Sequence, residues 1–150
     1  MEQHIRMART RDDAVTPNVA HEGEDVGLDL TLVGVRRWED GVTVYRTGWS
    51  ATPPPGFHLE LHAHSSVCNK GYMLANSVGI IERGYTGEIL VALHKFDDSK
   101  PDLKLPFKAA RLVLRRTHRP DFRIVDRLPD AASHKINGGF GSSDACTHRK

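Results

Sequence analysis

The stretch "GFHLELHAH", Gly56–His64, is the clearest structural signal in the sequence. Its apolar and polar side chains alternate strictly, and in a β-strand neighbouring side chains point to opposite faces. One face would carry Phe57, Leu59, Leu61 and Ala63, and the other His58, Glu60, His62 and His64. The pattern predicts a half-buried β-strand.

Short apolar segments separated by turn residues surround this stretch, as in all-β sandwiches and barrels. Four of them are further strand candidates: "VTVYRTGW" (42–49), "EILVALHKF" (88–96), "RLVLRR" (111–116) and "FRIVDRL" (122–128). The segment "EILVAL" is apolar on both faces, so we expect it in the centre of a sheet. The sequence therefore predicts an all-β fold.

Three regions differ in composition. Residues 1–24 are polar and unpatterned, and we expect a mobile N-terminal arm there. Residues 25–130 hold the strand candidates and form the predicted β domain. Residues 131–150 are small, polar and Gly-rich, which predicts a mobile C-terminal arm because such a segment has no apolar side chains to bury.

The composition of the 150-residue chain excludes several classes of protein. A formal net charge of +2 argues against a nucleic-acid or anionic-membrane partner. No apolar run is long enough to span a membrane, and the first residues lack the apolar core of a signal peptide. Cys68 and Cys146 form no CxxC motif and are expected to be free thiols. We expect a soluble, intracellular, cytoplasmic protein.

The stretch "NSVGIIERGYTGEI", Asn76–Ile89, reads as an apolar hairpin with a lone carboxylate, Glu82, at its tip. Glu82 either solvates a turn or carries out chemistry in a pocket formed by the hairpin. The residues of the hairpin alone leave both interpretations open.

Two other stretches suit phosphate binding but have ordinary alternatives. In "GGFGSS", Gly138–Ser143, glycine backbone N–H groups and two hydroxyls can converge on an anion, although such a stretch is commonly a linker. Ser65 and Ser66 follow His64 at the end of the first strand, where serines can donate to phosphate or simply form a turn.

A buried carboxylate and a histidine pair are the candidate metal ligands. Asp29 in "VGLDL" lies between apolar neighbours, so it needs a partner or a ligand, and beside phosphates it could hold the waters of a Mg²⁺ ion. His62 and His64 could chelate a metal, but no third ligand with suitable spacing is visible.

The order of these motifs resembles that of the trimeric dUTPase family over roughly residues 24–143. The family's motifs are matched, in order, by "VGLDL" (26–30), "AHSS" (63–66), "GIIERGYTGE" (79–88), "PFKAAR" (106–111) and "GGFGSS" (138–143). The hairpin and the last stretch match best.

This resemblance implies a jelly-roll-like β-barrel or sandwich of the dUTPase type, with a C-terminal arm closing over the active site. The implied reaction is hydrolysis of dUTP to dUMP and pyrophosphate, which cleans the nucleotide pool and supplies dUMP. The implied cofactor is Mg²⁺. The implied assembly is a homotrimer with shared active sites, in which the hairpin and the arm reach one site from different chains.

The resemblance also implies roles for single residues. Glu82 would be the catalytic base that activates water. Asn76, Gly79, Ile81 and Tyr85 would bind uracil and deoxyribose, and Asp29 would hold the metal through water. The remaining substrate-binding residues would be His64, Ser65, Ser66, Arg111, Lys135, Gly138, Gly139, Phe140, Gly141 and Ser142.

Several residues depart from the family pattern. Glu82 and His64 stand where the family has Asp and Arg, and Lys135 also replaces an Arg. Arg111 stands in place of a Gln, and Lys70 and Arg83 are expected near the site, so positive charge is relocated rather than lost.

These departures leave a catalytically silent nucleotide-binding or interaction module as an alternative. A relative of the dCTP deaminases is disfavoured, because "ILVALHK" (89–95) has no carboxylate where those enzymes carry a catalytic Glu.

Overall fold

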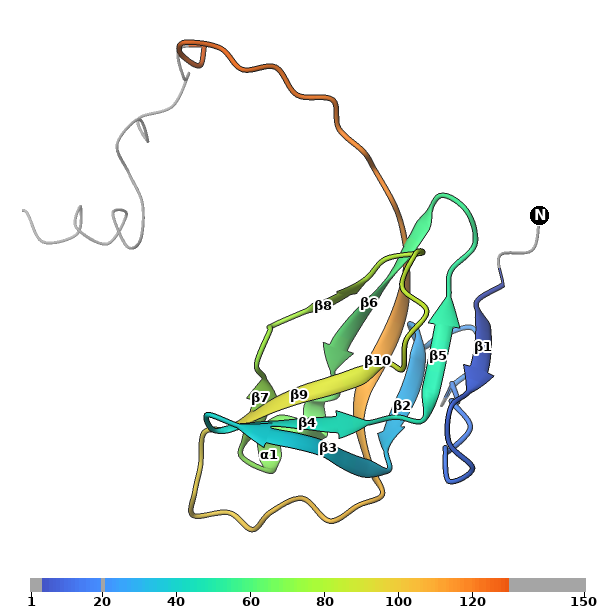
Figure 1. The fold of residues 1–150 in the computed structure, drawn as a ribbon, viewed down its shortest axis with the longest axis vertical. Coiled ribbons are helices and arrows are strands. Elements are labelled where there is room, and N and C mark those ends of the chain that lie inside the picture. The colour runs from blue at the N-terminus through green and yellow to red at the C-terminus, as the bar shows by residue number, and fades with distance from the viewer. Residues whose placement is uncertain (1–3, 20, 130–150) are drawn as a thin grey trace, which may run out of the picture. The chain divides into compact units, whose positions relative to one another are not determined.

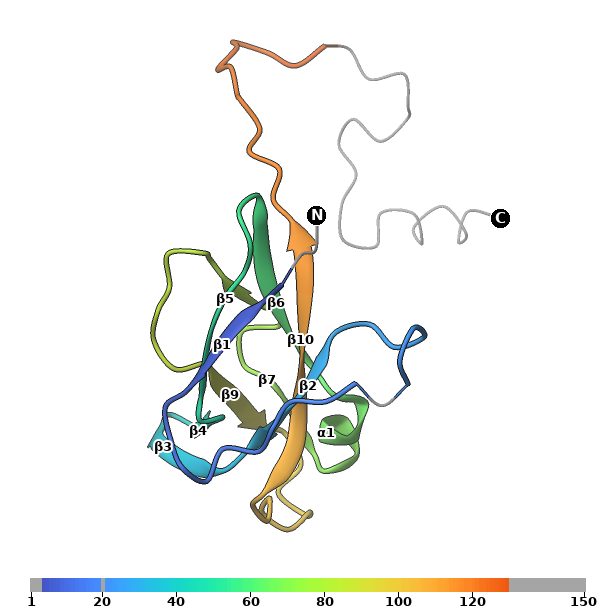
Figure 2. The same ribbon diagram turned by 90° about the vertical axis from the view of Figure 1, so that its right-hand side faces the viewer.

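The computed structural model describes residues 4–19 and 21–129. Antiparallel strands dominate, and α1 (Ser65–Asn69) is the one helix in these ranges. The first four-stranded sheet has the order β2 (Leu28–Leu32), β10 (Phe107–Arg116), β6 (Phe57–Ala63) and β8 (Gly79–Ile81). The second has the order β3 (Gly34–Glu39), β4 (Val42–Arg46), β9 (Leu90–Lys95) and β7 (Tyr72–Leu74). Figures 1 and 2 show both sheets, and the all-β prediction is confirmed.

Apolar side chains from both sheets form one core. Leu30, Leu59 and Leu112 of the first sheet and Val91 and Leu93 of the second are fully buried in the same cluster. Removing these side chains from water is the main stabilising contribution to such a fold. The expected central position of "EILVAL" is also confirmed, since β9 pairs with both β4 and β7.

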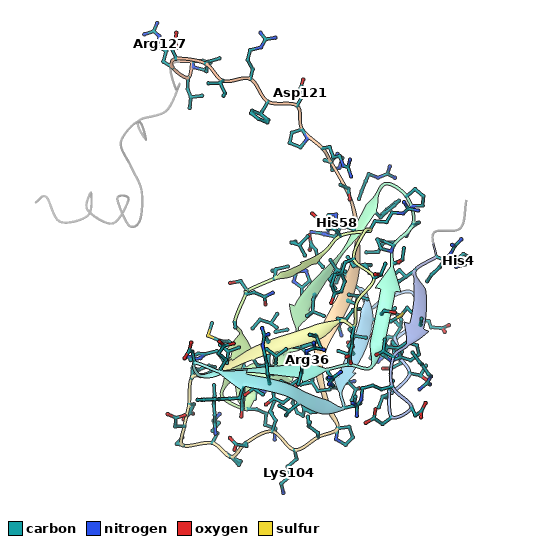
Figure 3. All side chains as sticks on the ribbon, viewed as in Figure 1. His4, Arg36, His58, Lys104, Asp121 and Arg127 are labelled. Carbon is teal, nitrogen blue, oxygen red and sulfur yellow. The ribbon has the colours of Figure 1, made fainter. Side chains whose placement is uncertain are left out.

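Strand β6 follows the alternation in the sequence. Leu59 and Leu61 are buried, whereas His58, Glu60 and His62 on the opposite face are half-buried. His58 lies where β6 begins, opposite Arg115 near the end of β10 (Figure 3). The outer face of this sheet therefore carries titratable side chains.

Strand β10 contains an irregularity that matters for this outer face. Its pairing with β2 shifts between Lys108 and Ala110, as at a β-bulge. Ala109 and Ala110 are both fully buried as a result. Lys108 and Arg111 both extend toward Asp29 of β2, although their spacing of three residues would separate them in a regular strand.

The prediction of an N-terminal arm over residues 1–24 is wrong for its central part. β1 (Arg6–Arg9) pairs with β5 (Trp49–Thr52) in a two-stranded sheet. Trp49 holds the end of β1 and the segment after β1 in place. Its Nε1 donates to the Val15 carbonyl at 2.8 Å, and the Arg9 guanidinium lies 4.8 Å from its ring centroid. A polar strand at a sheet edge needs few apolar residues, so β1 has no apolar pattern from which it could be predicted.

The β domain also ends earlier than the predicted residue 130. Strand β10 ends at Arg116, and the chain divides into one unit up to His118 and a second that begins at Arg119. The strand expected at "FRIVDRL" is not formed, since residues 119–129 contain no helix or strand.

Within the described ranges, no helix is long and apolar enough to cross a membrane. Cys68 is an exposed free thiol, as predicted, whereas Cys146 lies outside the described residues.

Candidate active site

The hairpin around β8 encloses a cavity of about 370 Å³, which we call the hairpin cavity. Its walls combine apolar side chains with a single carboxylate and a single amide. It is lined by Leu61, Asn76, Gly79, Ile80, Ile81, Glu82, Tyr85, Ile89 and Leu90. All five residues that the resemblance assigned to this stretch thus lie in one cavity.

Gly79 allows the hairpin to close tightly at its base. It pairs with Leu61 of β6, and a Cβ on Gly79 would lie 3.1 Å from the Leu61 Cβ and 3.5 Å from Asn76 Nδ2. A side chain would therefore crowd both the strand pairing and the amide. Glycine here lets Asn76 approach the cavity wall.

Tyr85 is fixed by the turn that follows it. Its hydroxyl donates to the Glu88 carbonyl at 2.6 Å, and a Cβ on Gly87 would lie only 2.7 Å from that hydroxyl. Glu88 is itself anchored, because its carboxylate accepts from Arg46 Nη1 at 2.8 Å and from the Gly48 N–H at 2.9 Å. The Tyr85 ring is therefore positioned over Gly87 by a rigid support.

Glu82 lies on the rim of the hairpin cavity, directly after β8. Its carbonyl accepts from the Tyr85 N–H at 3.0 Å, which closes the turn, and its side chain is exposed. The carboxylate forms no hydrogen bond or ion pair within residues 4–19 and 21–129. An ionised carboxylate without a partner can accept a proton from water.

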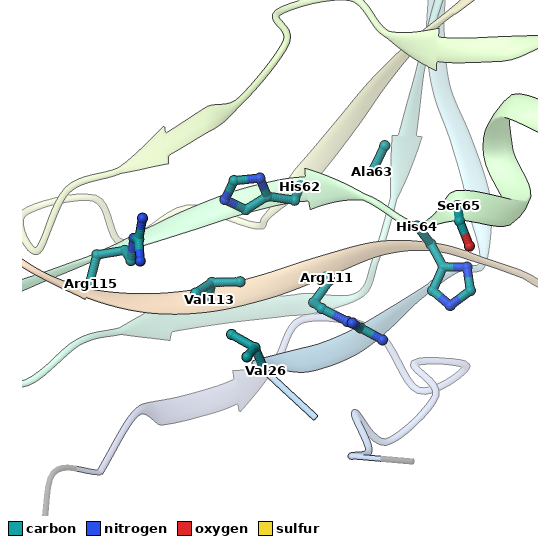
Figure 4. A pocket seen from close by; sticks show the side chains of 8 residues that line it. All are labelled: Val26, His62, Ala63, His64, Ser65, Arg111, Val113 and Arg115. Atoms are coloured by element: carbon teal, nitrogen blue, oxygen red, sulfur yellow. The ribbon is translucent and has the colours of Figure 1, made fainter. Parts of the chain in front are cut away.

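A second cavity, of about 460 Å³, lies on the outer face of the first sheet, and we call it the basic cavity. Figure 4 shows the Arg111 guanidinium pointing toward the side of the cavity that holds His64 and Ser65. The cavity is lined by Val26, His62, Ala63, His64, Ser65, Arg111, Val113 and Arg115. No carboxylate is among these residues, so the cavity suits an anion.

His64 and the serines lie at the start of the five-residue helix α1. His64 is the N-cap residue, and its Nδ1 accepts from the Ser66 N–H at 3.3 Å and lies 2.9 Å from Ser66 Oγ. Ser66 Oγ also lies 3.3 Å from the Lys108 carbonyl, to which it donates. Ser66 therefore serves the local structure, whereas Ser65 lines the basic cavity.

Asp29 is the buried carboxylate behind the basic cavity, and it is paired with two cations. Arg111 Nε donates to its Oδ1 at 3.0 Å, and Lys108 Nζ lies 3.4 Å from its Oδ2. Burial alone would raise the pKa of Asp29, but the hydrogen bonds and charges of Arg111 and Lys108 outweigh it and lower that pKa. The expectation that this carboxylate needs a partner is confirmed.

Glu60 is a second paired carboxylate, at the other end of the outer face of the first sheet. Its carboxylate lies 2.9 Å from His62 Nε2, 3.3 Å from His58 Nε2 and 3.4 Å from Arg115 Nε. The hydrogen bond from His62 is the main reason that the pKa of Glu60 is lowered, against a smaller opposing effect of burial. His62 and Arg115 are therefore occupied by Glu60.

Comparison with known proteins identifies the family. No family model matches the chain. The chain is 30% identical over 142 residues to the deoxyuridine 5'-triphosphate nucleotidohydrolase of Picosynechococcus sp., and the match covers 93% of this chain and 98% of the relative. The chain belongs to the dUTPase family. The enzyme of the same name from Leifsonia xyli is 35% identical over 130 residues, covering 85% and 84% of the two chains.

Solved dUTPases share the fold. A mutant dUTPase of Staphylococcus bacteriophage 80alpha, solved with dUpNHpp, superposes with a TM-score of 0.71 at 20% identity and covers 93% of this chain and 98% of its own. A mutant dUTPase of S. aureus phage phi11, described for its coordination of a structural Mg(II) ion, gives a TM-score of 0.68 at 18% identity, with coverages of 85% and 99%. The jelly-roll-like fold of the dUTPase type is thus confirmed.

The residues expected at one dUTPase site fall into two groups in this chain. Asn76, Gly79, Ile81, Glu82 and Tyr85 line the hairpin cavity. His64, Ser65 and Arg111 line the basic cavity, and Asp29 lies behind it. The arm residues Lys135, Gly138, Gly139, Phe140, Gly141 and Ser142 lie outside the described residues.

The two cavities of this dUTPase lie on opposite faces of β6. Leu61 lines the hairpin cavity and the next residue, His62, lines the basic cavity, while neighbouring side chains of a strand point to opposite faces. The cavities share no lining residue. Within one chain, the two groups of residues therefore line separate cavities.

The described residues do not fit the Mg²⁺ that the resemblance implies. No group of three or more His, Cys, Asp or Glu side chains in these ranges could hold a metal ion. The Asp29 side chain is only 2% exposed and already faces two cations, so it offers no accessible oxygen to the waters of a metal ion. His62 and His64 also lack a third ligand among the described residues.

Reasoning from sequence missed Lys108, which lies 3.4 Å from Asp29. Lys108 reaches Asp29 only because of the bulge in β10, which no local sequence pattern predicts. Lys70 and Arg83, expected near the site, line neither cavity, and Lys70 instead lines a separate one with Asp102 and Phe107.

Proposed function

We propose that this dUTPase-family chain hydrolyses dUTP to dUMP and pyrophosphate. The observation that carries this proposal is the convergence of Asn76, Gly79, Ile81, Glu82 and Tyr85 in the hairpin cavity. The family membership supports the same reaction. The hairpin cavity would take uracil and deoxyribose, and a basic cavity would take the phosphates.

Base selection would come from the narrow base of the hairpin. Uracil presents a fixed pattern of donors and acceptors, and a site built to pair with it leaves buried polar groups unpaired when cytosine enters. The Asn76 amide and the backbone around Gly79, which line the hairpin cavity, would make this pairing. The Tyr85 ring, fixed over Gly87, would lie beneath the sugar and disfavour a 2′-hydroxyl.

Glu82 would act as the general base. It would accept a proton from a water molecule that attacks the α-phosphorus, and the bond to the bridging oxygen would break to release pyrophosphate. Such reactions depend mainly on positioning and charge neutralisation. The exposed, unpaired carboxylate of Glu82 is free to hold that water.

The complete site would be shared between chains of a homotrimer. The opposite-facing cavities of one chain support this, because a hairpin cavity would need the basic cavity of a second copy. Phe122, Ile124 and Leu128, which follow the β domain, are 83%, 89% and 81% exposed. Apolar side chains left in water favour association, and each would contribute about 1.5–3 kcal/mol if a neighbouring copy buried it.

The proposed role of the Gly-rich segment, residues 131–150, rests on the sequence alone. Phe140 would close over the base, and the glycine N–H groups and Lys135 would bind the terminal phosphate. Deleting residues 131–150 should therefore remove most of the activity and leave the β domain folded.

The test is pyrophosphate release from dUTP, dCTP, dTTP and UTP, measured side by side. We expect release from dUTP to exceed that from each other nucleotide by at least about 100-fold in kcat/KM, because cytosine would leave buried polar groups unpaired, the methyl group of thymine would crowd the hairpin, and UTP would bring a 2′-hydroxyl against Tyr85. Equal turnover of UTP would refute the role of Tyr85. Tight dUTP binding without pyrophosphate release would instead identify the silent module.

A further inference from the structure

We propose that the basic cavity binds a triphosphate chain without a divalent cation, because Arg111 supplies the positive charge that a metal ion would otherwise supply. The inference rests on the proposed function for the identity of the anion as part of a nucleotide. It does not rest on hydrolysis or on recognition of uracil.

The Arg111 guanidinium is hydrogen-bonded through one nitrogen, which leaves its other two nitrogens free to bind a ligand. Its Nε donates to Asp29 Oδ1 at 3.0 Å, and Arg111 and Asp29 are direct cross-strand partners in β10 and β2. Neither Nη group has a hydrogen-bond partner among the described residues, and the side chain is 32% exposed. Both Nη groups are therefore available as a fixed fork for two phosphate oxygens.

The charges around the cavity leave no exposed carboxylate oxygen for a metal ion: Asp29 Oδ2 has no hydrogen-bond partner, but it is buried and lies 3.4 Å from Lys108 Nζ. The single carboxylate of Asp29 faces both Lys108 and Arg111, so this group carries a net positive charge. Glu60 is likewise paired with histidines and Arg115. Mg²⁺ at a phosphate site is usually held by one or two carboxylates in addition to phosphate oxygens and waters, and neither carboxylate here is free for it, whereas the net positive charge attracts a phosphate chain.

Ser65 and His64 complete the phosphate site beside Arg111. Ser65 lines the same side of the cavity, and His64 uses Nδ1 in the cap of α1, which leaves its Nε2 without a partner among the described residues. When Nδ1 accepts a hydrogen bond, the neutral ring carries its proton on Nε2 and can donate it. Figure 4 shows these side chains together at one end of the cavity.

The experiment is titration of the full chain with inorganic triphosphate by calorimetry, once in EDTA and once in excess Mg²⁺. We expect the wild type to bind in EDTA with a Kd within about threefold of its value in Mg²⁺. Arg111→Gln, which keeps N–H donors but removes the charge, should bind at least about tenfold more weakly in EDTA, as expected for the loss of a charged fork.

Arg116→Gln is the matched control, because Arg116 lies on the same strand as Arg111 but lines neither cavity. Its Kd in EDTA should stay within about threefold of the wild type. If Arg111→Gln does not fold, Arg111→Lys keeps a cation beside Asp29 but lacks the fork, and it should also weaken binding several-fold in EDTA.

Two results would overturn the inference. One is a wild type that binds inorganic triphosphate at least about tenfold more tightly with Mg²⁺ than with EDTA. The other is an Arg111 variant that binds in EDTA as the wild type does. A chain that fails to hydrolyse dUTP but binds triphosphate in EDTA would refute the proposed function and support this inference, so the two failures are distinguishable.

Discussion

The hairpin cavity and the basic cavity are built in different ways. The hairpin cavity comes almost entirely from one continuous stretch, residues 76–90, with Leu61 added from β6. The basic cavity combines Val26, residues 62–65 and residues of β10, which are far apart in the sequence. The hairpin cavity has an unpaired carboxylate, Glu82. The basic cavity is lined by cations, and the two carboxylates near it, Asp29 and Glu60, are already paired. One suits a neutral base and a proton acceptor, and the other suits an anion.

The largest effect is expected from replacing the carboxylate of the hairpin cavity. Glu82→Gln should lower kcat by about 1,000-fold and leave KM nearly unchanged, because the amide keeps the shape but cannot take a proton. Steady-state pyrophosphate release measures both constants. Arg83→Gln is the matched control, since Arg83 is the next residue and lines neither cavity. Wild-type kcat in Glu82→Gln would refute the assignment of the base.

Among the residues around the basic cavity, Asp29 should contribute most to the stability of the fold. Asp29→Asn would leave Arg111 and Lys108 facing a buried amide, and the free energy of unfolding should fall by about 3 kcal/mol at pH 7. Urea unfolding measures this loss. The comparison variant is Glu60→Gln, whose carboxylate also faces cations but is more exposed, and it should cost less.

The pH dependence of that loss follows from the lowered pKa of Asp29. A carboxyl whose pKa is lower in the folded than in the unfolded protein stabilises the fold fully above its unfolded pKa of about 3.9. The contribution disappears as the pH falls through the folded pKa. The stability difference between wild type and Asp29→Asn should therefore be constant from pH 7 to about pH 5 and shrink at lower pH. A difference that grows in acid would contradict the ion-pair account.

A smaller effect tests the support of Tyr85 in the hairpin cavity. Gly87→Ala should raise KM for dUTP about tenfold with little change in thermal stability, because the added Cβ would displace the Tyr85 hydroxyl. Gly84→Ala is the matched control, since a Cβ on Gly84 would meet no atom within 4 Å. Equal KM values for the two variants would show that the position of Tyr85 does not matter.

The sequence predicted the hairpin cavity far better than the basic cavity, for a physical reason. A short hairpin brings residues close in sequence together in space, so Glu82 and Tyr85, which the resemblance assigned to one site, line one cavity. Strand β6 and the central position of β9 also followed from local alternation and from burial on both faces.

Long-range features could not be predicted in this way. The bulge that brings Lys108 to Asp29 depends on the pairing of β10 with β2. The pairing of β1 with β5 depends on a turn and on Trp49, not on apolar residues in β1 itself. The segment "FRIVDRL" has the alternation of a strand, but the described residues of its own chain give it no pairing partner.

The central claim is that one active site takes its hairpin cavity and its basic cavity from different chains. The direct measurement mixes two inactive variants, Glu82→Gln and the double variant His64→Ala with Arg111→Ala, in equal amounts, unfolds them and refolds them together. If chains reassort at random, about one site in four receives an intact hairpin from one chain and an intact basic cavity from another. We predict recovery of about a quarter of the wild-type activity. No recovery, with mixed trimers verified by differently tagged chains, would contradict the claim.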